Sequence, residues 1–254
     1  MQDNFNPHKV EWTPEKTARV WDFYGSKAAF DTQRFAYHSG AAIVNWAQTV
    51  ISFSEATVVD YGCGAGDLLK HLLHQTSLKQ CFGLEFSDVS LQVANKSLTD
   101  DDRFKGVVLT QSLPSPLPAG GADIVLMVEV VEHLEDDALD STLREVNRLL
   151  KPGGYFVLTT PNREDIEAKE RICPDCGAIF HPKQHVRSWS AETLLAALAR
   201  FGFEADITIE TNWSYHKKGP LRRAIINVVN LLRGQQEVGK KHLGVIVRKT
   251  ENLQ

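Results

Sequence analysis

One short segment carries two carboxylates and a histidine at spacings suited to chemistry. Glu129, Glu132 and His133 stand at positions i, i+3 and i+4, so a helical turn over this segment would place all three side chains on one face. The ordinary pKa of histidine lies near neutrality, which makes His133 a candidate general base. The segment predicts proton transfer at this position, with the two glutamates beside the base.

Two cysteines and two histidines further along have the spacing of a metal site. Cys173 and Cys176 flank a Pro-Asp turn, and His181 and His185 follow in the pattern C-x2-C-x4-H-x3-H, which suits a tetrahedral zinc site. A structural zinc ion would order an insert that has little core of its own. The alternative is a metal-free loop of reduced thiols, in which His185 packs near a ligand site elsewhere in the chain. A redox pair is disfavoured because no thioredoxin-like context surrounds it.

A glycine-rich turn predicts a ligand site. An apolar run ends at Asp60, Gly62, Gly64 and Gly66 follow, and an apolar helix pattern then begins. Glycine lets a ligand approach the backbone closely, and a strand–turn–helix unit of this kind binds nucleotides at the carboxyl edge of a parallel sheet. Asp60 and Asp67 place negative charge on both sides of the turn, which disfavours a pyrophosphate and favours a ligand with a cationic end.

The run Val58-Val59-Asp60-Tyr61-Gly62-Cys63-Gly64-Ala65-Gly66 resembles the first motif of the class I S-adenosylmethionine-dependent methyltransferases. The resemblance implies S-adenosylmethionine as the cofactor, because its sulfonium and ammonium groups suit an acidic turn. Glu85 stands about twenty residues past the glycines, the spacing at which a carboxylate accepts ribose hydroxyls. The other residues expected at the cofactor are Phe86 on the adenine, Gln111 or Ser112 in place of the acid that the family often has there, and Val128 at the edge that faces the transferred methyl.

Strand and helix patterns alternate along the chain. Apolar runs predict strands over residues 57–61, 80–85, 104–110, 122–128, 155–160, 203–209 and 242–248, and periodic patterns predict helices over 66–75, 88–98, 136–150 and 191–201. This alternation predicts an α/β fold with a Rossmann-like, doubly wound sheet covered on both faces. The resemblance implies seven strands in the order 3-2-1-4-5-7-6, with the last strand antiparallel, in a single methyltransferase domain over residues 1–254.

Three segments lie outside this alternation. Residues 1–55 are rich in aromatic side chains and predict N-terminal helices, the first starting at Thr13-Pro14, which either pack on the sheet or form a lid over the site. Residues 161–189 hold the candidate zinc knuckle. Residues 211–241 predict a basic helical insert that covers the core or substrate, lies on a membrane surface, or binds an acidic acceptor such as a nucleotide-linked sugar.

Composition narrows the class of protein. With 254 residues, 43% of them hydrophobic, and a net charge of -4, the chain suits one α/β core. The main body is acidic, which disfavours nucleic acid as a partner. No apolar run has the length of a signal peptide or transmembrane span, so we expect a cytoplasmic protein.

These features predict methyl transfer from S-adenosylmethionine to a small molecule, with oxygen as the favoured acceptor atom and His133 as the general base. One alternative is a metal-dependent RNA 3′-terminal 2′-O-methyltransferase, a family with a similar Glu-Val-x-Glu-His segment and a later histidine. That resemblance implies a divalent ion held by Glu129, Glu132, His133 and His185, which competes with the zinc knuckle for His185. A further alternative is a module that binds the cofactor without turnover.

Overall fold

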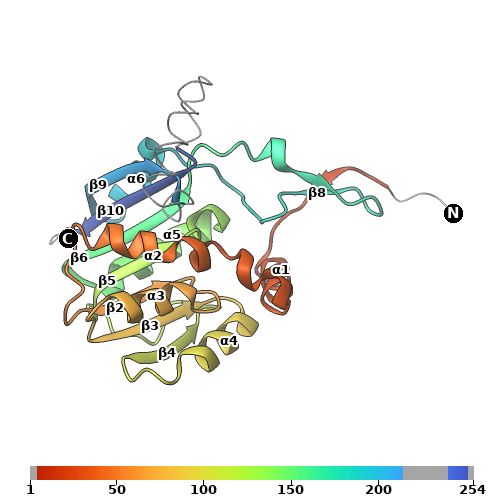
Figure 1. The fold of residues 1–254 in the computed structure, drawn as a ribbon. Helices are drawn as coiled ribbons and strands as arrows, with labels where there is room; N and C mark the ends of the chain where they lie inside the picture. The colour runs from red at the N-terminus through yellow and green to blue at the C-terminus, as the bar shows by residue number, and fades with distance from the viewer. Residues whose placement is uncertain (1–4, 214–239, 251–254) are drawn as a thin grey trace, which may run out of the picture.

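The computed structural model describes residues 5–213 and 240–250. Its central sheet holds the strands β2 (Thr57–Tyr61), β3 (Gln80–Glu85), β4 (Phe104–Leu109), β5 (Ala122–Val128), β6 (Leu150–Pro161), β9 (Phe203–Thr211) and β10 (His242–Lys249). Their order is β4-β3-β2-β5-β6-β10-β9 (Figure 1). Strand β10 is antiparallel to both of its neighbours, and the other neighbouring pairs are parallel. The predicted fold class and strand order are confirmed.

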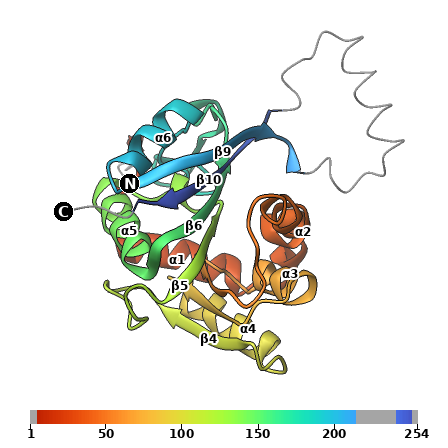
Figure 2. The same ribbon diagram turned by 90° about the vertical axis from the view of Figure 1, so that its left-hand side faces the viewer.

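Helices cover both faces of this sheet (Figure 2). One face packs against α2 (Phe35–Ala47), α3 (Asp67–Gln75) and the end of α4 (Asp88–Leu98), and the other packs against α5 (Asp136–Leu149) and α6 (Ala191–Ala199). Each face has its own cluster of buried apolar side chains, with Leu72 in the first and Leu143 and Phe156 in the second. Burial on both faces explains why the central strands are nearly all apolar.

One strand boundary and one helix cap differ from the sequence-based expectation. Strand β6 begins at Leu150, five residues before the predicted start at residue 155. The residues predicted to form a turn are part of the strand, and the register between β6 and β5 shifts there. Helix α4 begins as predicted at Asp88, but its cap is Ser87, whose hydroxyl accepts from the Ser90 N–H at 3.2 Å. The main elements otherwise end within two residues of the predicted positions.

The N-terminal segment lies against the site region. It forms α1 (Pro14–Gly25), the 3-10 turn η1 (Ala28–Gln33) and α2, and α1 begins at its predicted cap, Thr13. The indole of Trp21 donates to Gln184 Oε1 at 3.0 Å, and the hydroxyl of Tyr24 donates to the Pro182 carbonyl at 2.9 Å. These contacts join α1 to the insert after β6. A lid function for residues 1–55 remains a prediction.

The insert after β6 forms a small sheet that the sequence did not predict. Strands β7 (Arg171–Ile172) and β8 (Ala178–Phe180) make a hairpin, and β1 (His8–Lys9) pairs with β8 in parallel. Figure 1 shows this three-stranded sheet extending away from the main body. Most of the predicted basic insert, residues 211–241, lies outside the described residues. Among the helices of the described part, none combines the length and apolar character that a membrane crossing requires.

Replacing Leu143 on α5 by alanine tests the core. Leu143 is 1% exposed in the cluster between α5 and the sheet, so Leu143→Ala is expected to lower the free energy of unfolding by about 2–5 kcal/mol. Urea denaturation followed by circular dichroism measures the change. The matched control is Val93→Ala on α4, whose side chain is 39% exposed and whose loss should cost less than about 0.5 kcal/mol. Equal losses for the two variants would contradict the packing described.

Candidate active site and cofactor site

The glycine turn after β2 is shaped for a ligand. Gly62, Gly64 and Gly66 all adopt positive φ angles, of 76°, 53° and 83°, a region that side chains other than glycine rarely occupy. A Cβ atom on Gly62 would lie 2.5 Å from a methyl of Val130, whereas a Cβ on Gly64 would have no atom within 4 Å. The backbone at Gly64 therefore borders open space, where a ligand can approach it.

Two buried carboxylates stand beside the turn. Glu85, at the end of β3, accepts from the Gly64 N–H at 2.7 Å and from the Ser87 N–H at 2.8 Å. Asp60 is 1% exposed, and its Oδ2 has no hydrogen-bond partner. Burial raises the pKa of both carboxyls. A polar ligand that donates a hydrogen bond to Asp60 Oδ2 would satisfy this atom, so the residues present fit S-adenosylmethionine. The role of Glu85 on the ribose remains a prediction.

Asp67 differs from its predicted role. Its carboxylate lies 2.5 Å from Arg34 Nε and 3.9 Å from Lys70 Nζ, so its negative charge is paired within the protein. The expectation of two free acids repelling a pyrophosphate is wrong for Asp67. Asp60 and Glu85 are the buried acids that remain beside the turn.

The predicted adenine contacts lie on neighbouring strand ends. Phe86 follows β3 and is half-buried, and Gln111, after β4, donates its side-chain amide to the Phe86 carbonyl at 3.3 Å. Gln111 and Ser112 are exposed, and Val128 at the end of β5 is 8% exposed. The roles of these four residues toward the cofactor remain predictions.

The segment after β5 forms a shorter turn than expected. Glu129 has a φ of 55°, and only Val131–His133 form a 3-10 turn, η2. The helical turn that would include Glu129 is therefore absent. Glu129 Oε1 accepts from Thr159 and Glu132 Oε2 accepts from Thr160, each at 3.0 Å. Burial raises the pKa of Glu129 to about 8 and that of Glu132 well above its usual range.

His133 is held in one orientation and one tautomer. Its Nδ1 lies 3.3 Å from the Gln184 carbonyl, and the Gln184 side-chain amide donates to the His133 carbonyl at 2.9 Å. Because a carbonyl only accepts, Nδ1 carries the proton and Nε2 has the free lone pair. This Nε2 lies 3.7 Å from Glu132 Oε1, which has no hydrogen-bond partner. Burial lowers the pKa of His133 to about 3, so the ring is neutral near pH 7.

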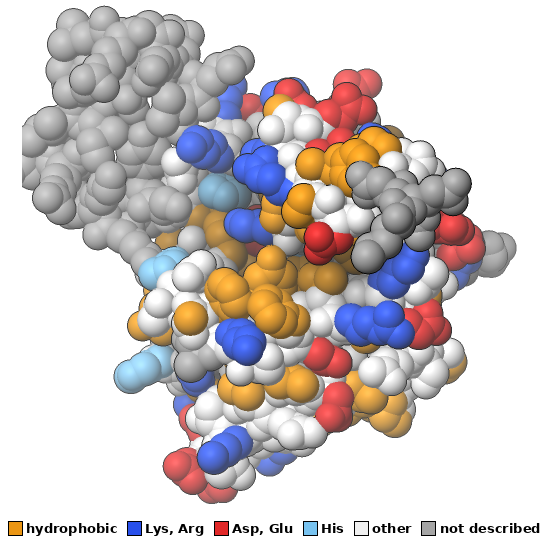
Figure 3. Space-filling view, turned by 90° about the vertical axis from the view of Figure 1, so that its right-hand side faces the viewer, with side chains coloured by type: hydrophobic (Ala, Val, Ile, Leu, Met, Phe, Trp, Pro, Cys, Tyr) orange, Lys and Arg blue, Asp and Glu red, His pale blue; other side chains and the backbone are white. Residues whose placement is uncertain are grey.

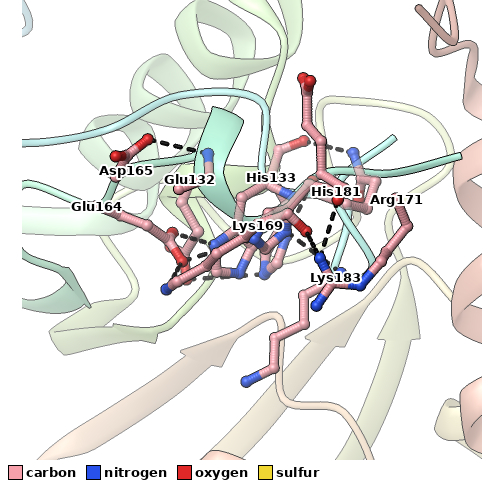
Figure 4. A network of polar contacts seen from close by, with 12 residues as sticks. Glu132, His133, Glu164, Asp165, Lys169, Arg171, His181 and Lys183 are labelled. Carbon is pink, nitrogen blue, oxygen red and sulfur yellow. Dashed lines mark hydrogen bonds and ion pairs between the residues drawn. The ribbon is translucent and has the colours of Figure 1, made fainter. Parts of the chain in front are cut away.

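The two histidines of the insert meet this segment. His185 Nδ1 contacts Glu164 Oε2, its ring lies 4.8 Å from the His133 ring, and it stacks on His181 at 4.4 Å. Figure 4 shows Glu132 and His133 from the β5 turn, Glu164 from the β6 end and His181 from the insert lying close together. In two groups the ligand atoms lie within 4.8 Å of one another: one of Glu132, His133 and His185, the other of Glu164, His181 and His185.

The predicted Cys2His2 ligand set is not assembled. Cys173 and Cys176 lie on the hairpin turn between β7 and β8, where the Gly177 N–H donates to the Cys173 carbonyl at 2.9 Å. Among the described residues, no group of three candidate ligands contains a cysteine. The chain leaves the hairpin directly after β8, which carries His181 and His185 toward Glu164 and away from the cysteines. Zinc binding by this insert remains a prediction.

Sequence reasoning missed Glu164 and Gln184. Glu164 follows β6 at the carboxyl edge of the sheet, a position at which functional side chains of this fold class gather, so its place was a usable signal. Gln184 adopts a φ of 57° and is 1% exposed. Nothing in the sequence distinguishes this glutamine from an ordinary surface residue.

The fold and the glycine turn define a class I S-adenosylmethionine-dependent methyltransferase. Residues 33–207 match the family model described as a methyltransferase domain, and the chain belongs to this family. A ubiquinone biosynthesis O-methyltransferase of Leptothrix cholodnii is 32% identical over 124 residues, which are 47% of this chain and 51% of that protein. A probable tocopherol O-methyltransferase of Oryza sativa subsp. japonica is 29% identical over 125 residues, 47% of this chain and 33% of that protein.

This chain thus spans about half the length of the first of these curated relatives and a third of the second. Among solved structures, the 1,6-didemethyltoxoflavin-N1-methyltransferase of Burkholderia thailandensis, with bound 1,6-didemethyltoxoflavin and S-adenosylhomocysteine, is similar with a TM-score of 0.62 and 18% identity. The similarity covers 96% of this chain and 94% of that one. At this identity it supports the fold alone.

Gly64→Ala tests the cofactor cradle. The added methyl would stand in the open space beside Gly64, so we expect the Kd for S-adenosylmethionine, measured by calorimetry, to rise at least about tenfold, a change of about 1.4 kcal/mol. The matched control is Gly120→Ala, since Gly120 has a similar φ of 63° and no atom within 4 Å of its Cβ position. Gly120 lies between β4 and β5, away from the glycine turn. Gly120→Ala should therefore strain the backbone as Gly64→Ala does but leave the Kd for S-adenosylmethionine unchanged. Equal Kd values for the two variants would refute this placement of the ligand.

Proposed function

We propose that the chain transfers the methyl group of S-adenosylmethionine to a hydroxyl oxygen of a small molecule. The observation that carries the proposal is the contact between the two turns. Strands β2 and β5 are neighbours, and Val130 lies so close to Gly62 that a Cβ on this glycine would clash with it. The segment with His133 is therefore packed against the turn expected to hold the cofactor.

The chemistry needs a positioned oxygen and a place for its proton. As the acceptor oxygen attacks the methyl carbon, the carbon–sulfur bond breaks, and its electron pair remains on sulfur as a neutral thioether. Alignment of the two reactants supplies most of the rate enhancement. The oxygen then carries both a methyl group and a proton and is a strong acid. His133 Nε2 can accept that proton even with its pKa lowered to about 3.

Two observations support a small molecule with an oxygen acceptor. The curated relatives named above are O-methyltransferases by name. On the face shown in Figure 3, most of the described Lys and Arg side chains are scattered among apolar and acidic ones, although several gather in the upper left of the view, whereas a nucleic-acid site typically needs a continuous basic surface. The predicted site for a nucleotide-linked sugar acceptor, the basic cluster Lys217, Lys218, Arg222 and Arg223, lies outside the described residues.

Replacing His133 tests the assigned role. With a panel of phenolic and catecholic acceptors, His133→Gln is expected to lower kcat by about 10²–10⁴-fold while leaving the Kd for S-adenosylmethionine within about twofold. S-adenosylhomocysteine release and product mass report turnover and the methylated atom. The control is His74→Gln, an exposed histidine on α3, which should behave as the unchanged protein does.

Three outcomes would contradict the proposal. Methylation at nitrogen would show that the acceptor atom is not oxygen. Methylation of RNA 3′ ends would favour the RNA 3′-terminal 2′-O-methyltransferase alternative. Tight cofactor binding without turnover on any acceptor would favour a non-catalytic module.

A further inference from the structure

Two adjacent residues of α1 reach two different parts of the site. Trp21 contacts Gln184 in the insert after β6, and Asp22 contacts Ser87 immediately before α4. Successive residues of an α-helix point about 100° apart around its axis, so the two side chains can serve different neighbours. Both residues are half-buried.

The contact of Asp22 leads to the acid that is predicted to bind the ribose. The Ser87 hydroxyl donates to Asp22 Oδ1 at 2.6 Å, and the Ser87 N–H donates to Glu85 Oε1 at 2.8 Å. Ser87 is 1% exposed and Glu85 is 8% exposed, and a buried polar group that loses its partner is costly. Asp22 therefore fixes the residue that holds one oxygen of the Glu85 carboxylate.

The contact of Trp21 leads to the proposed base. The indole N–H donates to Gln184 Oε1 at 3.0 Å, and the Gln184 side-chain amide donates to the His133 carbonyl at 2.9 Å. The Trp21 ring also meets the His133 ring edge to face, with the two centroids 4.9 Å apart. Gln184 is buried in a left-handed conformation, with a φ of 57°, and its carbonyl lies 3.3 Å from His133 Nδ1. A strained residue persists only where its surroundings hold it, and here Trp21 is one of those surroundings.

Other contacts hold the end of α1 in place. A Cβ on Gly25 would lie 2.8 Å from the Ser90 hydroxyl, so α1 and α4 approach closely there. The Tyr24 hydroxyl donates to the Pro182 carbonyl at 2.9 Å. These contacts do not involve the side chains at positions 21 and 22. A single substitution at either position is therefore expected to change one set of contacts while α1 stays docked.

We infer that Trp21 and Asp22 are positioning residues that serve separate halves of the reaction. Asp22 keeps the Glu85 carboxylate in place for the ribose hydroxyls of the cofactor. Trp21 keeps the His133 ring in the tautomer with its proton on Nδ1, so that Nε2 has the lone pair that accepts the proton of the acceptor. The inference rests on the proposed function, since it assigns positions to groups that the methyl transfer uses, and misplaced groups slow such a reaction.

Substitution of Asp22 tests the cofactor half. Asp22→Ala is expected to raise the Kd for S-adenosylmethionine, measured by calorimetry, about three- to tenfold, because Ser87 loses its acceptor and Glu85 its fixed orientation. Asp22→Asn retains an oxygen that can accept from the Ser87 hydroxyl, so its Kd should stay within about twofold of the wild-type value. Both variants should leave the tautomer of His133 unchanged.

Substitution of Trp21 tests the base half. Trp21→Phe removes the indole N–H but keeps an aromatic ring beside His133. ¹⁵N NMR of histidine-labelled protein shows which ring nitrogen carries the proton, and the spectrum of His133→Gln assigns the signals. We expect the proton on Nδ1 in the wild-type protein and a mixture of tautomers in Trp21→Phe. Its kcat should fall about three- to tenfold, with the Kd for S-adenosylmethionine within about twofold of the wild-type value.

The control is Arg19→Ala, an exposed position on the same helix, which should change none of these quantities. A change in both the Kd and the tautomer from a single substitution would overturn the inference, because it would show that the residue only holds α1 in place. So would an unchanged Kd in Asp22→Ala, an equal rise in Asp22→Asn, or an unchanged tautomer in Trp21→Phe. A changed tautomer with an unchanged kcat would refute the base role of His133 in the proposed function and leave both positioning roles standing.

Discussion

The pairing of β2 with β5 is the constraint on which the rest of the site depends. Parallel neighbours end at the same edge of a sheet, so the turns that follow them must meet. Here the meeting is tight enough that Gly62 has no room for a side chain beside Val130. The register between β2 and β5 therefore sets the relative position of the cofactor turn and the segment with Glu132 and His133. No specific contact between side chains of the two turns is needed to bring them together.

Burial then decides the chemistry of the groups placed there. Glu129, Glu132 and His133 are removed from water, and burial favours the neutral form of each. Glu164 is the exception: despite partial burial, its contact with His185 and its ion pair with Lys169 lower its pKa to about 2. Glu164 is thus an ionised carboxylate in contact with His185, whereas Glu132 and His133 near the same ring are neutral. This difference in charge orients the ring of His185.

The sequence predicted the sheet well, because strand identity there is set by apolar runs and glycine spacing that need no knowledge of the rest of the chain. The sequence predicted the strand ends that border the site better than it predicted which side chains form the site. Asp67 was expected to face a ligand, but Arg34, which is 33 residues away, neutralises it. The cysteines matched a zinc spacing, yet the hairpin between β7 and β8 separates them from the histidines. Glu164 and Gln184 act through contacts with distant residues, and no local pattern encodes such contacts.

The pairing of β1 with β8 has a consequence for how the molecule assembles. His8 lies beside Ala178, so this contact closes a loop of 170 residues (178 minus 8). Closing so long a loop is entropically unfavourable until the intervening sheet has already shortened the distance. We therefore expect the small sheet, and with it the hydrogen bond from Trp21 on α1 to Gln184, to form late. The central sheet should therefore be in place before the groups around His133 reach their final arrangement, and destabilising the hairpin should loosen the N-terminal helix while leaving the central sheet folded.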